Sequence, residues 1–377
     1  MGDNPKASGS VAQAPRRIVE LDGLRTIAIA LVILFHVLRV PVAHHSPLDY
    51  PTRPFAFGWG GVDVFFVLSG FLIGGILFAQ RDRPGAMKRF LLRRCVRILP
   101  LYFAVVACFF AAKALNGPAW MLDGSTPAWT YLTLTQNYAT AFLKTDAWAL
   151  GPTWSLAVEV QLYLLLGVLI LFAPRRAIMP VLALGIVLSV VLRLALVAAD
   201  EGIMGYFLTP ARMDGAFIGA LVSQAMLRDD IRGRVSRNGA KLWLLCGGLF
   251  ALAMLSAAAG QGIGSIGSGL FGHFGLSLAT ALIILLIVSR PGDWPNALLR
   301  LPAMTFVGTI SYGIYLLHLP VIGAVHELFG RDTVLLDGPI AGLATTLGIA
   351  ATVALSYLSF RWFETPLNRM AHRYTPS

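Results

Sequence analysis

The most informative residues of this sequence are ionisable side chains that interrupt long apolar stretches. A charged group near the centre of a bilayer costs at least ~2.5–3.5 kcal/mol on insertion scales, so such residues are functional candidates by default. They are Arg25, His36, Asp63, Glu159, Arg212, Asp214 and His318. Imidazole and carboxylate groups transfer protons and guanidinium groups bind anions, so the set predicts acid–base chemistry at a buried site.

Arg25 and His36 lie in the first apolar stretch, eleven positions apart. A helix rises ~1.5 Å per residue, so about 16 Å separates them along the axis. Eleven residues make about three turns, which places both side chains on one face. Imidazole accepts protons near neutral pH, and we expect His36 to act as a general base. A carboxylate would orient its ring, and the sequence leaves Glu159 and Asp63 as alternatives.

The other candidates fall at similar depths in the outer half of their stretches, which predicts a shared polar cavity. Each also has a structural interpretation. Asp63 would be an interfacial residue at a helix end, and Arg212 would neutralise Asp214. A lone histidine such as His318 is usually structural, whereas Glu159 is hard to explain without a partner.

A basic run at 88–97 leads directly into the third apolar stretch. Arg94 and Arg97 are three apart on the expected helix and would present neighbouring guanidinium groups. Such a pair suits bidentate contacts with phosphate. The alternative is a topology signal or an anchor for anionic lipids.

Small residues recur at helical spacing in two of the stretches. Gly70 follows Ser69 and precedes Gly74, and Gly215 precedes Gly219 with the same spacing. This pattern favours close packing of helices. At Gly70, close approach of a ligand is equally compatible with it.

Composition places these residues in a membrane. Hydrophobic residues make up 56% of the 377 residues, charged residues 13%, and the mean hydropathy is +0.71. Soluble domains carry about 25% charged residues. The net charge of +11 sits in short blocks between apolar stretches, as topology signals do, so we reject nucleic-acid binding. Cys95, Cys108 and Cys246 show no disulfide or zinc spacing, and no metal site is expected.

About ten apolar stretches predict an all-α, polytopic helix bundle. They cover 24–41, 59–79, 98–115, 153–173, 178–198, 207–227, 242–259, 269–289, 304–325 and 339–360. The stretch at 207–227 is the weakest because Arg212 and Asp214 interrupt it. Most of the 30 lysines and arginines lie at one side of this arrangement, which predicts that both termini are cytoplasmic.

The longest outer loop, 116–152, is rich in aromatic residues and poor in charge. Its aromatic residues include Trp120, Trp129, Tyr131, Tyr138 and Trp148. The loop would either form an interfacial aromatic belt or fold back as a partial helix over a binding site. Residues 1–17 are expected to be a disordered cytoplasmic segment, and 367–377 a cytoplasmic tail.

Six segments, in order, resemble the acyltransferase 3 family of membrane acyltransferases. They are Leu21–Arg25 with His36; 65–72; Arg94 and Arg97 before Pro100 and Tyr102; Trp154–Leu156 with Glu159 and Tyr163; Ser311–Leu316 with His318 and Pro320; and Glu364–Pro366. The resemblance runs over about 18–366, which we take as the membrane acyltransferase domain.

The resemblance implies an O-acyltransferase with ten spans in the cell inner (plasma) membrane. Its donor would be cytoplasmic acyl-coenzyme A, acetyl-coenzyme A by default, without a metal. Its acceptor would be a hydroxyl of an extracytoplasmic or lipid-linked glycan in the cell envelope. Some relatives acylate antibiotics or other small molecules instead, and homo-oligomer formation is left open.

The resemblance and the depths together give each candidate a role. His36, Arg25, Glu159 and Asp63 would be catalytic. Coenzyme A would contact Arg93, Arg94, Arg97, Ser69 and Gly70, and the acceptor would contact Trp154, Ser155, Tyr163, Tyr312 and His318. Direct transfer is favoured over an acyl-enzyme on His36 or Ser155.

Two other classes of protein remain as alternatives. A proton-coupled transporter would use the buried charges as a path and would need no acyl-coenzyme A. A lipid-sensing or scaffolding protein would need His36 only for stability.

Overall fold

The structure is a computed structural model that describes residues 18–40, 49–115, 117–118, 126–145, 147–259 and 263–374. Throughout these ranges the regular elements are helices, as predicted, and the described residues contain no strand. The expected disordered segment 1–17, Trp120 of the predicted outer loop and the last three residues of the tail lie outside the described residues. The rest of the tail belongs to a terminal helix.

Nine helical segments of the described chain are long and apolar enough to cross a membrane. Their helices are α1 (Glu20–Leu34) with η1 (Phe35–Arg39), η2 (Arg53–Gly60) with α3 (Gly61–Gln80), α4 (Ala86–Ala114), η3 (Trp148–Leu150) with α8 (Thr153–Phe172), α9 (Arg175–Ala198), α13 (Gly239–Ala258), η5 (Ser268–Gly275) with α14 (Leu276–Ser289), α16 (Pro302–Thr309) with α17 (Ser311–Leu328), and α18 (Pro339–Ser359) with η6 (Phe360–Glu364) and α19 (Thr365–Tyr374). The short helices are α2 (Asp49–Thr52), α6 (Ala128–Leu132), α7 (Gln136–Leu143), α10 (Met204–Phe207), η4 (Thr209–Ala211), α11 (Met213–Ala225), α12 (Asp229–Arg237) and α15 (Trp294–Leu299). The chain is therefore a multi-pass membrane protein.

The predicted stretch 207–227 is the one that does not form a full-length span. Its helix α11 has 13 residues, which at ~1.5 Å per residue is well short of a hydrocarbon core about 30 Å thick. The short elements α10 and η4 precede it, and the α-helix resumes only after Arg212. Nine of the 13 residues of α11 are buried within the bundle and none is exposed, so neighbouring helices largely shield it from lipid.

Two glycine pairs bring α3 and α11 into close contact. A Cβ atom at Gly70 would lie 2.0 Å from the carbonyl oxygen of Ala216, and one at Gly219 would lie 2.1 Å from that of Val67. Gly74 similarly faces Ala220. The small-residue spacing therefore serves helix packing at both motifs, and Gly70 faces α11.

The helix α4 begins well before its apolar stretch. It runs through the basic segment 88–97 and past Pro100 without a break. The basic residues are thus the first turns of the span itself, and their side chains project from a helix packed against α8 and α17.

The described part of the loop 116–152 packs against the bundle, and the interpretation that it covers a binding site stays a prediction. The loop forms α6 and α7, and α7 packs against α8. Tyr102 on α4 donates a hydrogen bond to the carbonyl oxygen of Tyr131 at 2.9 Å, while Trp129 is exposed.

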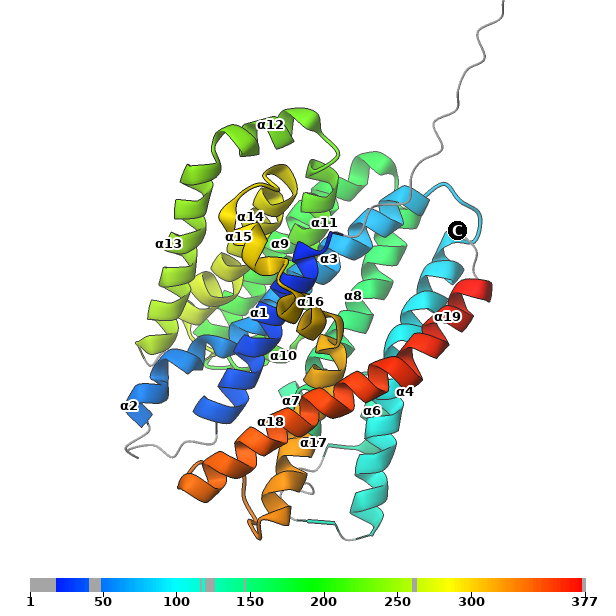
Figure 1. Cartoon of the computed structure of the whole chain (residues 1–377). Coiled ribbons are helices and arrows are strands. Elements are labelled where there is room, and N and C mark those ends of the chain that lie inside the picture. The colour runs from blue at the N-terminus through cyan, green and yellow to red at the C-terminus, as the bar shows by residue number, and fades with distance from the viewer. Residues whose placement is uncertain are drawn as a thin grey trace, which may run out of the picture.

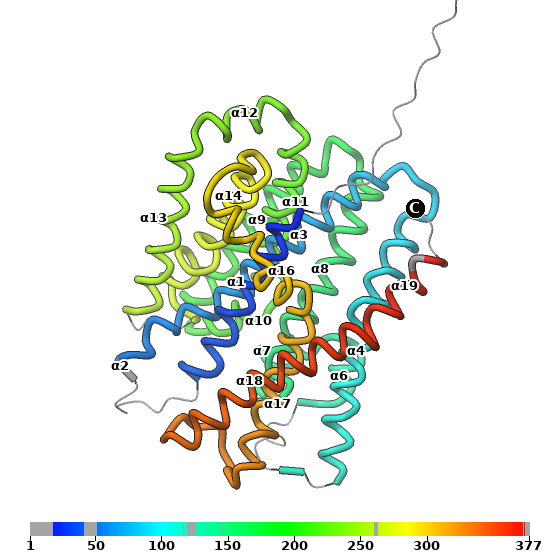
Figure 2. The backbone as a smooth tube through the Cα atoms, in the orientation of Figure 1, coloured from blue at the N-terminus to red at the C-terminus, as the bar shows by residue number. Residues whose placement is uncertain are grey.

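Figures 1 and 2 show how the helices run between two ends of the molecule. The turn from α3 to α4, α12 and α15 lie toward one end, and α2 and the connection from α17 to α18 lie toward the other (Figure 1). The α3–α4 turn, α12 and α15 therefore lie toward the same end of the molecule. The cytoplasmic location of the termini stays a prediction.

Candidate functional site

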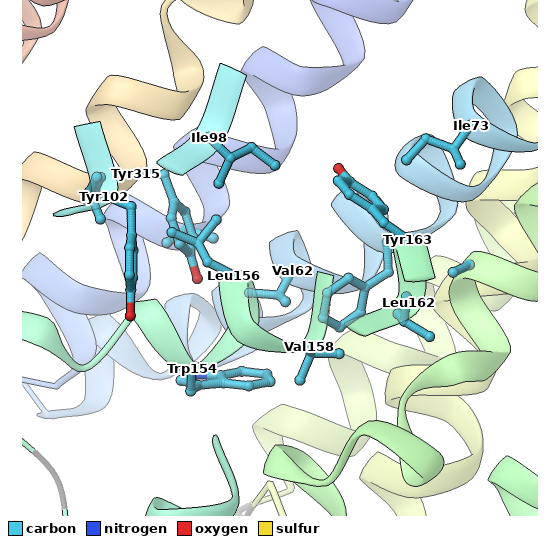
Figure 3. Close-up of a cluster of buried hydrophobic side chains, with 14 of the residues drawn as sticks. Val62, Ile73, Ile98, Tyr102, Trp154, Leu156, Val158, Leu162, Tyr163 and Tyr315 are labelled. Carbon is cyan, nitrogen blue, oxygen red and sulfur yellow. The ribbon is translucent and has the colours of Figure 1, made fainter. Parts of the chain in front are cut away.

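A cavity of about 90 Å³ lies between α1, α3, α4, α8 and α17. Its polar lining is supplied by Arg25, Ser69, Arg94, Arg97, Ser155, Glu159, Tyr163, Ser311, Tyr312 and Tyr315. Figure 3 shows the rings of Tyr163 and Tyr315 on opposite sides of Val62 and Leu156, which belong to its apolar wall. The structure thus brings together residues from five helices that are far apart in the sequence.

Glu159 is the only acidic side chain among the residues that line this cavity. Its Oε1 accepts a hydrogen bond from Ser69 Oγ at 2.5 Å and another from the hydroxyl of Tyr163, one turn further along α8. Glu159 therefore has hydrogen-bond donors, as a carboxylate in an apolar stretch was expected to need. It joins α3 to α8 at the cavity wall.

Three arginines line the same cavity. The guanidinium group of Arg94 lies 5.8 Å from the ring centroid of Tyr163, and Arg97 is exposed, so the cavity opens beside it. Arg25 is half-buried and forms an ion pair with Asp22 at 2.7 Å. Arg93, the remaining predicted phosphate ligand, is not among the lining residues.

A pair of histidines lies beyond Ser155 and Tyr315 of the cavity wall. Ser155 and Tyr315 share a hydrogen bond of 2.6 Å, and the carbonyl oxygen of Tyr315 lies 2.7 Å from Nδ1 of His318. The rings of His318 and His36 follow, with centroids 5.0 Å apart. His36 lies on η1, just beyond the end of α1.

Both histidines have one ring nitrogen held by a backbone carbonyl. Nδ1 of His36 lies 2.9 Å from the carbonyl oxygen of Val32, and Nδ1 of His318 makes the equivalent contact with Tyr315. Because a carbonyl only accepts, each Nδ1 carries the proton and each Nε2 keeps its lone pair. Among the described residues, neither Glu159 nor Asp63 forms a hydrogen bond with His36.

Tyr312 and Trp154, two predicted acceptor ligands, differ in their surroundings. The hydroxyl of Tyr312 donates to the carbonyl oxygen of Ile98 at 2.6 Å and its side chain lines the cavity. Trp154 is buried against Phe66 and Tyr206 outside the cavity lining.

Asp63 belongs to a separate, closed ion cluster formed by α3, α11 and η5. Its carboxylate pairs with Arg212 at 2.9 Å and with Nδ1 of His273 at 3.0 Å. Arg212 and His273 are at most 1% exposed. Asp214 pairs instead with Arg193 of α9 at 2.7 Å. The predicted neutralisation of Arg212 by Asp214 is therefore wrong, because each residue meets a closer partner on another helix.

The prediction that the ionisable candidates share one polar cavity is also wrong. Arg25 and Glu159 line the cavity, Asp63 and Arg212 lie in the ion cluster, and the two histidines lie beyond Tyr315. Equal depth in the bilayer does not decide which side of a helix a residue occupies.

Sequence reasoning singled out neither Arg193 nor His273. Both interrupt apolar stretches, at 178–198 and 269–289. The rule that selected His36 would therefore have found them. In the described part of the chain no group of three or more metal-ligating side chains comes together.

A bundle of membrane-spanning helices around a polar cavity of this composition defines a multi-pass membrane protein with an internal polar cavity. The family model described as "Acyltransferase domain" matches residues 18–361. The chain belongs to the acyltransferase 3 family.

Curated relatives are similar over nearly the whole chain. One is the peptidoglycan O-acetyltransferase OatA of Listeria monocytogenes serovar 1/2a (strain ATCC BAA-679 / EGD-e), 25% identical over 93% of this chain and 56% of the relative. Another is the O-acetyltransferase OatA of Staphylococcus aureus (strain NCTC 8325 / PS 47), 24% identical over 94% of this chain and 58% of the relative. The chain thus spans somewhat more than half the length of these relatives. No solved structure was found to match it.

Proposed function

We propose that this protein is a membrane O-acyltransferase of the inner (plasma) membrane. It transfers an acyl group, acetyl by default, from cytoplasmic acyl-coenzyme A to a hydroxyl of an extracytoplasmic or lipid-linked glycan. The observation that carries the proposal is the cavity, which three arginines line and whose wall residue Tyr315 contacts His318, the neighbour of His36. The names of the O-acetyltransferase relatives support the acetyl group, and one of those names supports peptidoglycan as acceptor.

The donor end rests on an excess of positive charge. Arg94 and Arg97 line the cavity with one carboxylate, Glu159, which already accepts two hydrogen bonds, whereas the third arginine, Arg25, is paired with Asp22. An anionic ligand is needed to balance the guanidinium groups, and phosphates accept bidentate contacts from arginine. The basic end of α4 is also the predicted cytoplasmic end, where coenzyme A is available.

The acceptor end rests on the histidine pair. The Val32 carbonyl orients His36 and leaves Nε2 to accept a proton, so a backbone group does what a carboxylate was expected to do. Nε2 of His318 is buried and has no hydrogen-bond partner among the described residues, which leaves it available to an acceptor hydroxyl. Glu159 then holds Ser69 and Tyr163 in place at the donor side.

The reaction follows as a direct transfer. The acceptor oxygen attacks the thioester carbonyl carbon while Nε2 of His36 takes the hydroxyl proton. The new C–O bond forms, the C–S bond breaks, and the proton passes to the departing thiolate of coenzyme A. Exclusion of bulk water from the bundle protects the thioester from hydrolysis.

Release of coenzyme A from acetyl-coenzyme A by the purified full chain in detergent tests the proposal. His36→Gln should lower the rate by about 10²–10⁴-fold, the usual contribution of a general base. His326→Gln is the matched control, since His326 lies on α17 and bonds Thr345 away from the cavity. Near-normal release by a folded His36→Gln variant would contradict the assignment of the base.

Binding of the donor separates this function from transport. Equilibrium binding of acetyl-coenzyme A should be measurable in wild type and should persist in His36→Gln, because the proposed phosphate ligands are unchanged. If no acyl-coenzyme A of any chain length bound, the proton-coupled transporter would become the better interpretation.

A further inference from the structure

A second hollow lies outside the cavity, at the end of the bundle where α3, α4 and α8 meet. This groove has a volume of about 920 Å³ and is lined by residues of the α3–α4 turn, the first turns of α4 and the end of α8. Its lining residues are Arg81, Asp82, Arg83, Pro84, Gly85, Ala86, Met87, Lys88, Leu91, Leu92, Cys95, Leu171 and Phe172. The proposed transfer reaction uses none of them.

The groove has a cationic rim. Arg83 and Lys88 are exposed and form no salt bridge with a described residue. Arg81 donates hydrogen bonds to the carbonyl oxygens of Ile170 and Ala173, which hold its positive charge at the end of α8. The acidic Asp82 is neutralised at 2.6 Å by Arg175, which lies outside the groove lining. The rim therefore keeps a net positive charge.

The floor of the groove is apolar. Leu91 and Leu92 of α4 line it together with Leu171 and Phe172 of α8, and Phe172 is 68% exposed. These side chains belong to two helices long enough to span a membrane, so the floor continues into the hydrocarbon region. Water-soluble anions gain nothing from such a floor, whereas an acyl chain does.

The groove and the cavity use different faces of α4. Successive residues of a helix are turned by about 100°, so Lys88, Leu92 and Cys95 project away from the face that carries Arg94 and Arg97. A ligand in the groove therefore does not occupy the donor site.

We infer that this groove binds one anionic phospholipid, with its phosphate at Arg83 and Lys88 and an acyl chain against the apolar floor. Cations at the end of membrane-spanning helices attract anionic headgroups. A zwitterionic lipid carries no net charge to balance the rim, and free phosphate has no chain for the floor. The bound lipid would steady the start of α4, the helix that positions Arg94 and Arg97.

The chain contains its own reporter for this site. Cys95 is a free, exposed cysteine in the groove, and Cys108 is a free, exposed cysteine on the same helix outside it. The experiment follows alkylation of both thiols by N-ethylmaleimide, by peptide mass spectrometry of the full chain in a non-ionic detergent. Dioleoyl phosphatidylglycerol should slow alkylation at Cys95 and leave Cys108 unchanged, and dioleoyl phosphatidylcholine should protect neither.

The rim is tested by substitution. Arg83→Gln/Lys88→Gln should weaken protection of Cys95 by phosphatidylglycerol by about thirtyfold in concentration, as expected for the loss of two cations near an anionic headgroup. Arg237→Gln/Lys241→Gln is the control, because it removes two exposed cations near the junction of α12 and α13. In this variant phosphatidylglycerol should protect Cys95 as well as it does in wild type.

Three results would overturn the inference. The first is equal protection by the two lipids, and the second is unchanged protection in Arg83→Gln/Lys88→Gln. The third is protection of Cys95 by acetyl-coenzyme A or inorganic phosphate as strong as that by phosphatidylglycerol, which would assign the groove to a soluble phosphate. Coenzyme A release is measured separately, so failure here leaves the proposed transfer reaction standing.

Discussion

The cavity and the buried ion cluster both place arginines inside the membrane bundle, but their charges are balanced differently. In the cluster, Arg212 meets Asp63 and Arg193 meets Asp214, and all four side chains are almost completely buried. In the cavity, Arg94 and Arg97 share the lining with the single carboxylate of Glu159, and Arg97 is exposed. A balanced, closed set of charges stabilises the fold, whereas an unbalanced, open set is typical of a site that awaits an anionic ligand.

The difference also concerns which helices are joined. The cluster ties α11 to α3 and α9, and close glycine contacts hold the same helices together. The cavity lies between helices linked by only a few side-chain hydrogen bonds, such as Ser69 to Glu159. Substitutions in the two regions should therefore affect different properties, stability in one and activity in the other.

Arg212→Met should have the largest effect on stability. It leaves Asp63 buried with a weaker partner, and breaking a buried pair costs about 3–5 kcal/mol. Asp63→Leu/Arg212→Met should recover most of that loss, because no unpaired charge remains. Thermal unfolding in detergent measures both variants. If Arg212→Met alone were as stable as wild type, the cluster would not be structural.

Arg94→Gln and Arg97→Gln should each affect donor binding and leave the unfolding temperature nearly unchanged. Loss of one charged hydrogen bond of about 1.5–3 kcal/mol raises the KM for acyl-coenzyme A by roughly 10–100-fold. Arg89→Gln is the matched control, since Arg89 lies on the same helix, does not line the cavity, and within the described ranges its side chain donates to the carbonyl oxygen of Pro84. Equal effects of all three substitutions would mean that general attraction to the basic run, not the cavity, explains binding.

Gly70→Ala should destabilise the α3–α11 contact by about 1–3 kcal/mol, the usual cost of overpacking. Its Cβ would lie 2.0 Å from the backbone oxygen of Ala216, which cannot move independently of its helix. Gly75→Ala on the same helix meets no atom closer than 4.0 Å and should be neutral. The free energy of unfolding distinguishes the two. If Gly70→Ala instead altered only KM, Gly70 would belong to the donor site.

Asp293→Asn should have the smallest effect. Asp293 lies at the surface between two spans, where hydrogen bonds from Arg290 and then Trp243 lower its pKa below the usual 3.8. The charged form is therefore favoured by folding, and its contribution is present near neutral pH and is lost as the pH falls below about 4. We expect less than about 1 kcal/mol, as for other surface pairs. The unfolding temperatures of wild type and Asp293→Asn should differ at pH 7 and converge at pH 3; a difference that grew at low pH would contradict this sign.

Much of the fold was predictable from the sequence because each span satisfies its own backbone. The predicted stretches 153–173 and 339–360 match α8 and α18 almost residue for residue. The stretch at 207–227 was identified as weak because of Arg212 and Asp214, and there the helix is short. The start of α4 was missed, since hydropathy marks where a helix enters lipid and not where it begins.

The candidate site was predictable only as a set of residues. Apolar context selected Arg25, His36 and Glu159, and helical spacing selected Arg94 and Arg97. Neither signal predicted that Ser69 and Tyr163 would hold Glu159, that the Val32 carbonyl would orient His36, or that His273 would join Asp63.

The sequence by itself determined that this is an all-helical membrane protein and which buried groups need an explanation. Both follow from local physics, because span length and the cost of an isolated charge are set within one helix. Only the tertiary structure decided how those groups are used. Ser69 with Glu159 and Asp63 with Arg212 are partners from distant parts of the chain, and small rotations and offsets between packed helices decide whether a charge meets its counterion or faces an open cavity.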